Sequence, residues 1–164
     1  MPAGPAVTAL LLAALWLAGG CAPEGAQPGS IADSYYADAT DAGLVREGRE
    51  IYAMHCASCH GVALEGEENW RRRKPSGRMP APPHDASGHT WHHPDWELFM
   101  ITRDGISPLA PPDYESDMPA FGGVLTDQEI LAVIAYIKAQ WPADIAAVQQ
   151  DINRRAPPDD IRRR

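Results

Sequence analysis

The chain has 164 residues, a formal net charge of −8 and a hydrophobic content of 45%. This length accommodates one ordinary domain, and the acidic balance argues against a nucleic-acid-binding domain, which would show a basic face. Three cysteines cannot form a closed set of disulfides, so a disulfide-based scaffold is not expected. These values therefore indicate one small acidic domain whose cysteines have a role other than forming structural disulfides.

Residues 1–20 contain no charged side chain and have the pattern of a signal peptide. Their apolar run at residues 9–18 is too short to span a bilayer, so it predicts export rather than a transmembrane helix. Small residues then precede Cys21, and this arrangement resembles a bacterial lipoprotein signal, in which the cysteine becomes the first mature residue and bears lipid. The resemblance implies a bacterial periplasmic protein anchored to a membrane through Cys21. Ordinary signal peptidase cleavage is the alternative.

The next stretch, residues 21–42, is rich in Ala, Pro, Gly, Ser and Asp and shows no hydrophobic period. Such a composition predicts a flexible tether between the anchor and the folded part. A helical pattern follows at residues 44–55, with Gly48, Ile51 and Tyr52 near one face. The sequence therefore places the start of the folded domain close to residue 43.

The motif that indicates chemistry is CASCH at residues 56–60. A C-x-x-C-H sequence is the attachment pattern of c-type haem, because two thiols three positions apart on a helical turn can each add to a haem vinyl group. Cys56 and Cys59 are therefore predicted to bind one haem c covalently, and His60 is the predicted proximal ligand of its iron. A thioredoxin-like dithiol would follow a β-strand rather than a helix, and a zinc site would need ligands from elsewhere in the chain.

Another helix is predicted towards the end of the chain. Thr126 and Glu129 have the spacing of a capping box, and Pro142 prevents continuation beyond Trp141. Together with the motif and the first helix, this pattern resembles a class I, mitochondrial-type, cytochrome c domain. The resemblance implies an all-α fold over residues 43–142, with at least three helices wrapped around one covalently attached haem.

The same resemblance implies how the two terminal helices meet and which residue is the sixth iron ligand. Gly48 and Tyr52 of the first helix and Tyr136 of the last match the usual contact residues. Met118 precedes Pro119 in the loop ahead of the last helix, where class I cytochromes place their ligand methionine. Met79 also precedes a proline, but a long stretch with a middle helix, expected between Pro94 and Gly105, separates it from the last helix.

Charged and histidine-rich segments lie between the two predicted iron ligands. Residues 71–74 are all cationic, and either a docking patch for an acidic partner or a solvated loop would explain them. Acidic residues dominate the loop before Met118.

Residues 143–164 form a C-terminal extension that is predicted to begin as a helix and that ends in three arginines. Four histidines lie within ten residues, and they are His84, His89, His92 and His93. They could bind copper or zinc, or they could have ordinary structural roles such as capping a helix.

His/Met ligation would favour ferrous iron and leave no open position for a substrate, so the sequence predicts an electron carrier rather than an enzyme. Its expected partners are redox proteins such as a terminal oxidase, a reductase or a dehydrogenase, and nucleic acid is not among them. One alternative is a haem-based gas sensor, or an accessory haem domain of a redox enzyme. Another is a copper-handling protein that uses the histidines between His84 and His93.

Overall fold

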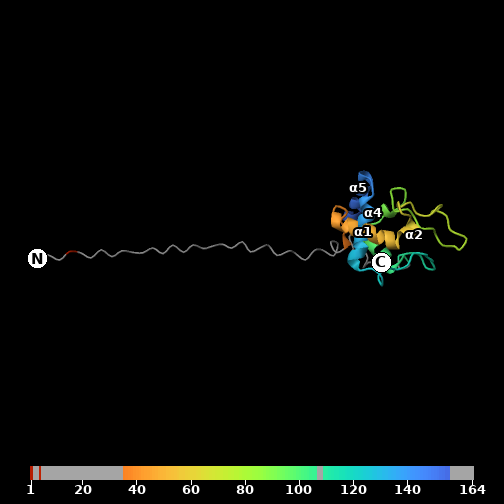
Figure 1. Ribbon diagram of the computed structural model, residues 1–164, viewed down its shortest axis with the longest axis horizontal. Coiled ribbons are helices and arrows are strands. Elements are labelled where there is room, and N and C mark those ends of the chain that lie inside the picture. The colour runs from red at the N-terminus through yellow and green to blue at the C-terminus, as the bar shows by residue number, and fades with distance from the viewer. Residues whose placement is uncertain (2–3, 5–34, 107–108, 156–164) are drawn as a thin grey trace.

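The computed structural model describes residues 1, 4, 35–106 and 109–155, so most of the predicted signal peptide, Cys21 and the terminal arginines lie outside the described residues. The described residues form helices and loops without a strand, and the predicted all-α class is confirmed. None of these helices is long and apolar enough to cross a membrane. The helices, shown in Figure 1, are α1 (Ala42–His55), α2 (Ala57–His60), the 3-10 helix η2 (Thr90–His92), α3 (Asp95–Asp104), α4 (Asp127–Ala139) and α5 (Ala143–Arg155).

Local hydrogen bonds fix where α1 and α4 begin. The carboxylate of Asp41 accepts the backbone N–H groups of Gly43 at 2.8 Å and Leu44 at 3.1 Å, which satisfies donors that the first turn of α1 leaves free. The predicted capping box of α4 is present: the Glu129 N–H donates to Thr126 Oγ1, and Glu129 Oε2 accepts the Thr126 N–H at 2.8 Å.

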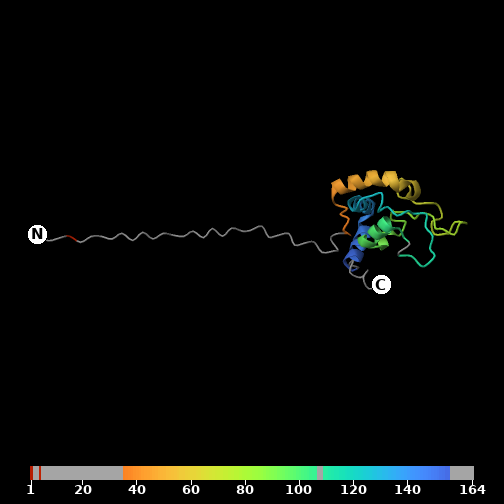
Figure 2. The same ribbon diagram turned by 90° about the horizontal axis from the view of Figure 1, so that it is seen from below.

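The core lies where α1 crosses α4 and where α3 packs beside α4. Figure 2 shows α1 running across α4, which is seen almost along its own axis. The rings of Tyr52 and Tyr136 lie 5.4 Å apart at this crossing, as the resemblance implied. The buried apolar side chains from these three helices are Ile51, Tyr52, Leu98, Phe99, Ile130, Ala132, Val133, Ile134, Ala135 and Ile137.

The folded body extends beyond the predicted domain of residues 43–142 at both ends. Ala37 is fully buried and donates its N–H to the buried carboxylate of Asp95 at 2.9 Å, and the Tyr35 ring lies 5.0 Å from that of Phe99. On α5, the buried Gln149 side chain donates to the other oxygen of Asp95 at 2.7 Å. One buried carboxylate therefore binds both flanking segments, so residues 35–41 are not part of a free tether and α5 is part of the body.

Gly48 gives a first test of the helix crossing. It is buried, and a Cβ atom at this position would overlap the backbone carbonyl of Ala132 and lie 3.0 Å from the Cβ of Tyr136. Gly48→Ala is therefore expected to lower the free energy of unfolding by about 3 kcal/mol, because backbone cannot move aside as a flexible side chain can. The measurement is urea unfolding followed by circular dichroism.

The matched control is Gly123→Ala, where an added Cβ meets nothing within 4 Å. This variant is expected to change the free energy of unfolding by less than ~0.5 kcal/mol. Equal losses in the two variants would show that the α1–α4 contact does not depend on the missing side chain of Gly48.

Candidate functional site

The C-x-x-C-H motif lies immediately after α1 and forms a single tight turn. The Cys56 N–H donates to Tyr52 O at 2.9 Å, and the His60 N–H donates to Cys56 O, also at 2.9 Å. Cys56 is half-buried, and Cys59 is exposed. The turn therefore brings together two thiols and one imidazole, as the motif predicts.

The surroundings of Cys56 do not favour either of the two alternatives for the motif. Burial, together with the neighbouring Cys59, raises the pKa of the Cys56 thiol to about 11. A reactive dithiol needs a lowered pKa, and zinc binds the thiolate. The described residues also contain no group of three or more His, Cys, Asp or Glu side chains placed to hold a metal ion. Neither a thioredoxin-like dithiol nor a preformed zinc site is supported.

His60 has the surroundings of a metal-ligating imidazole. It is buried, and its Nδ1 lies 2.9 Å from the carbonyl oxygen of Pro82. Burial lowers the pKa of His60, which favours the neutral ring. A neutral ring that donates from Nδ1 to a carbonyl has its lone pair on Nε2, and such a hydrogen bond orients metal-binding histidines. Pro82 lies in the proline-rich run that passes beside the motif.

The backbone segment 81–85, which we call the strap, is fixed beside His60 by three parts of the chain. Glu67 accepts the Ala81 N–H at 2.6 Å, and the His84 N–H donates to Leu64 O at 2.8 Å. The indole N–H of Trp141, which follows α4, donates to His84 O at 2.8 Å. The position of the Pro82 carbonyl is thus set by hydrogen bonds that do not involve His60.

The ring of His84 stacks directly on the ring of His60. Their centroids are 3.9 Å apart with an angle of 16° between the planes, and the Tyr52 ring approaches His84 edge-on at 5.9 Å. Burial and the neighbouring imidazoles lower the pKa of His84 well below its usual value. In the sequence, His84 is recognisable only as one of four clustered histidines. Its position two residues after Pro82 is the one local feature that links it to His60.

The remaining histidines make separate aromatic contacts. His89 stacks on Trp70 at 5.4 Å and meets His93 edge-on at 5.5 Å, whereas His92 stacks on Trp91 at 3.7 Å. Because the described residues hold no group of three metal-ligating side chains, the copper alternative has no ready-made ligand set.

Met118 lies in the loop between α3 and α4. It is half-buried, packs against the hydrophobic core and donates its N–H to Ser116 Oγ at 3.0 Å. Three residues later, the ring of Phe121 meets the ring of His55 edge-on at 6.2 Å, and His55 directly precedes Cys56. The fold therefore brings the end of the Met118 loop to the start of the attachment motif.

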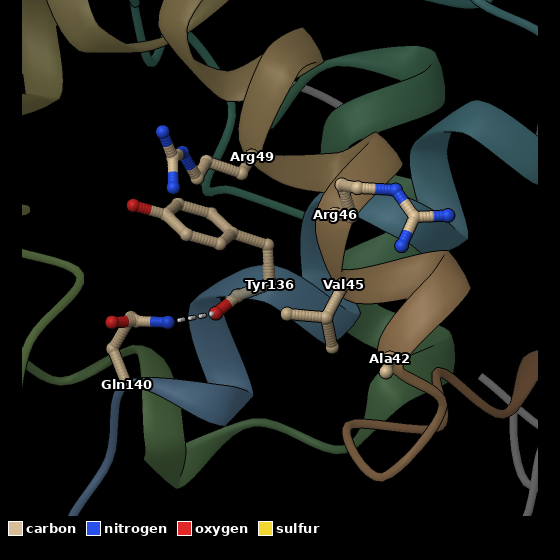
Figure 3. A pocket seen from close by; sticks show the side chains of 6 residues that line it. All are labelled: Ala42, Val45, Arg46, Arg49, Tyr136 and Gln140. Carbon is tan, nitrogen blue, oxygen red and sulfur yellow. Dashed lines mark hydrogen bonds between the residues drawn. The ribbon is translucent and has the colours of Figure 1, made fainter.

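A surface depression lies elsewhere, over the first two turns of α1 and the end of α4. Figure 3 shows Tyr136 of α4 and Gln140, which follows the helix, beside Val45, Arg46 and Arg49 of α1. No residue of the C-x-x-C-H motif lines it. This depression is therefore separate from the candidate site.

The residues around the motif fit a haem group. In the described part of the chain, the buried Nδ1 of His84, on the ring that stacks against His60, lacks a hydrogen-bond partner. Buried polar atoms are normally satisfied, so such atoms are expected where a further polar group belongs. The two thiols and the Nε2 of His60 supply the covalent links and the proximal ligand that a haem c requires.

The family model described as Cytochrome c matches residues 45–141, which is more than half of the chain. This range runs from the first turn of α1 through the motif and the Met118 loop to Trp141. Searches of curated proteins and of solved structures gave no match. Members of the matched family bind covalently attached haem c, and Cys56 and Cys59 have the spacing that attachment requires. The chain therefore belongs to the cytochrome c family, whose haem transfers electrons.

Proposed function

We propose that this cytochrome c is a periplasmic carrier of single electrons, with His60 and Met118 as the axial ligands of one haem c. The observation that carries the proposal is the arrangement around the motif. Pro82 O holds His60 from one side at 2.9 Å, and the half-buried Met118 lies in a loop whose Phe121 meets His55. A histidine ring oriented by a carbonyl and a methionine loop packed on the core both support His/Met ligation.

The protein's part in electron transfer is to hold and tune the group that carries the charge. When bound, the haem supplies a one-electron iron couple. Cys56 and Cys59 bind it covalently, and the Nδ1–Pro82 hydrogen bond keeps the His60 ring in one orientation. As a ligand, the thioether of Met118 would favour the ferrous form and raise the reduction potential, and it would leave no position for small ligands.

The location and partners belong to the same proposal. The apolar, uncharged residues 1–20 followed by Cys21 support export and lipid anchoring. An anchored periplasmic carrier would exchange electrons with redox proteins such as a terminal oxidase, a reductase or a dehydrogenase.

The test is a redox titration of the purified, haem-loaded protein combined with exposure of its ferrous form to CO. An electron carrier is expected to titrate reversibly with a one-electron slope and to leave CO unbound at micromolar concentration. Met118→Ala provides the positive control for CO binding. Rapid CO binding by the unmodified protein would instead favour the gas-sensor alternative.

A further inference from the structure

Two charged loops, residues 67–78 and 113–117, are joined by ion pairs. Lys74 Nζ lies 3.0 Å from Glu67 Oε2 and 3.4 Å from Asp117 Oδ2. Arg78 contacts Asp117 through Nη1 at 2.6 Å and Glu115 through Nε at 3.2 Å. We call these five residues the loop clamp; they are Glu67, Lys74, Arg78, Glu115 and Asp117.

The loop clamp connects the backbone beside both proposed axial ligands. Asp117 directly precedes Met118. At the other end, Glu67 accepts the N–H of Ala81 at 2.6 Å, and the next residue in the strap is Pro82, the hydrogen-bond partner of His60. In Figures 1 and 2 the two loops extend from the same side of the helices, near α2.

The cationic block at residues 71–74 is largely engaged within the chain. The guanidinium of Arg71 lies 4.0 Å from the Trp70 ring centroid, and Arg73 donates to Gly77 O at 2.7 Å. Lys74 contributes to the loop clamp. These contacts give the block a role within the molecule that does not need an acidic partner.

We propose that Asp117, held by Lys74 and Arg78, is the positioning residue that keeps Met118 on the haem iron. This inference rests on the proposed function, because it requires Met118 to be the sixth ligand. Met118 lies in the loop between α3 and α4. The described residues of this loop form neither helix nor strand. Ordering such a loop costs conformational entropy, and a weak thioether bond gains most from a loop that is already held in place.

The expected effect is modest and depends on ionic strength. About 40% of the Arg78 side chain and 45% of the Asp117 side chain are exposed. Exposed ion pairs contribute little individually and are screened by salt. The clamp should therefore change how often Met118 leaves the iron without deciding whether the protein folds.

The experiment compares the Asp117→Asn variant with the unmodified protein, both loaded with haem. Two quantities are measured: the rate of CO binding to the ferrous form and the far-red sulfur-to-iron band of the oxidised form. Asp117→Asn keeps the side-chain shape and removes the charge, and we expect CO binding to be roughly three to ten times faster at low ionic strength. In the unmodified protein the rate should rise towards that of the variant at about 1 M salt.

Asp113→Asn is the matched control, because it removes the same charge from the same loop and Asp113 has no ion pair among the described residues. A second comparison combines Asp117→Asn with Arg78→Gln. If the two residues act as a pair, the double variant should be little faster than Asp117→Asn alone.

Three outcomes would overturn the inference. They are an Asp117→Asn variant indistinguishable from the unmodified protein, an equal effect of Asp113→Asn, and a CO-binding rate that does not change with salt. If the unmodified protein shows the far-red band and Met118→Ala loses it, any of these three outcomes overturns the role of the loop clamp but leaves His/Met ligation standing. If the unmodified protein lacks the band, His/Met ligation fails, and the role of Asp117 fails with it.

Discussion

Replacing Met118 with alanine is expected to abolish the far-red sulfur-to-iron band of the oxidised, haem-loaded protein. The variant loses the thioether but keeps the covalent links through Cys56 and Cys59 and the proximal His60. Its ferrous form should bind CO readily, because the sixth position is open. Its reduction potential should fall by on the order of 0.1 V, since a thioether stabilises the ferrous state and axial ligands set haem potentials over ~0.8 V.

Met79→Ala is the control for this prediction. Met79 also precedes a proline and is half-buried, but unlike Met118 it is not among the side chains that pack against the core in the described part of the chain. It should retain the band, leave CO unbound and change the potential little. The opposite pattern, with the band lost in Met79→Ala and kept in Met118→Ala, would exchange the two assignments.

The parts of the site that the sequence predicts are those formed over short distances along the chain. The C-x-x-C-H turn spans five residues, and the α4 capping box spans four. The apolar residues of α4, which are Ile130, Val133, Ile134 and Ile137, recur with the helical period in the sequence, and all four are buried. In each case the interacting residues lie within about one turn of each other, where spacing alone determines geometry.

The parts that the sequence does not predict depend on contacts between distant segments. The stacking of His84 on His60 depends on the path of the strap, and the Arg78–Asp117 pair joins residues 39 positions apart. Considered as sequence, the basic block fits either a docking patch or a solvated loop, and nothing links it to the acidic loop before Met118. Only the folded chain shows that Lys74 and Arg78 bind the acidic loop.

The same limit applies to the ends of the domain. Residues 35–41 have the composition of a linker, and the buried Ala37 among them is bonded to Asp95, which is more than fifty positions away. Lys138 follows Ile137 on α4, and periodicity gives no sign that a lysine there would be buried. Its partner is the same distant carboxylate.

The buried ion pair between Lys138 and Asp95 gives the prediction with the largest expected effect on stability. Lys138 Nζ lies 2.5 Å from Asp95 Oδ2 and donates to Ala37 O at 2.7 Å. Only 6% of the Lys138 side chain and 5% of the Asp95 side chain are exposed. Lys138→Met would remove the only countercharge paired with this carboxylate among the described residues, while Ala37 and Gln149 would still donate to it.

Lys138→Met is therefore expected to lower the free energy of unfolding by about 3–5 kcal/mol, because an uncompensated buried charge remains. The measurement is urea unfolding of the haem-loaded protein. Hydrogen exchange should also show reduced amide protection in residues 35–38 and in α5, since both segments are bound through Asp95.

Arg154→Met is the matched control, because it breaks an ion pair in which 68% of the arginine side chain is exposed. Its expected cost is less than ~1 kcal/mol, since exposed pairs contribute little. A similarly small loss in Lys138→Met would contradict the buried ion pair. A large loss with unchanged amide protection in α5 would mean that Asp95 stabilises the α3–α4 contact without holding the C-terminal helix in place.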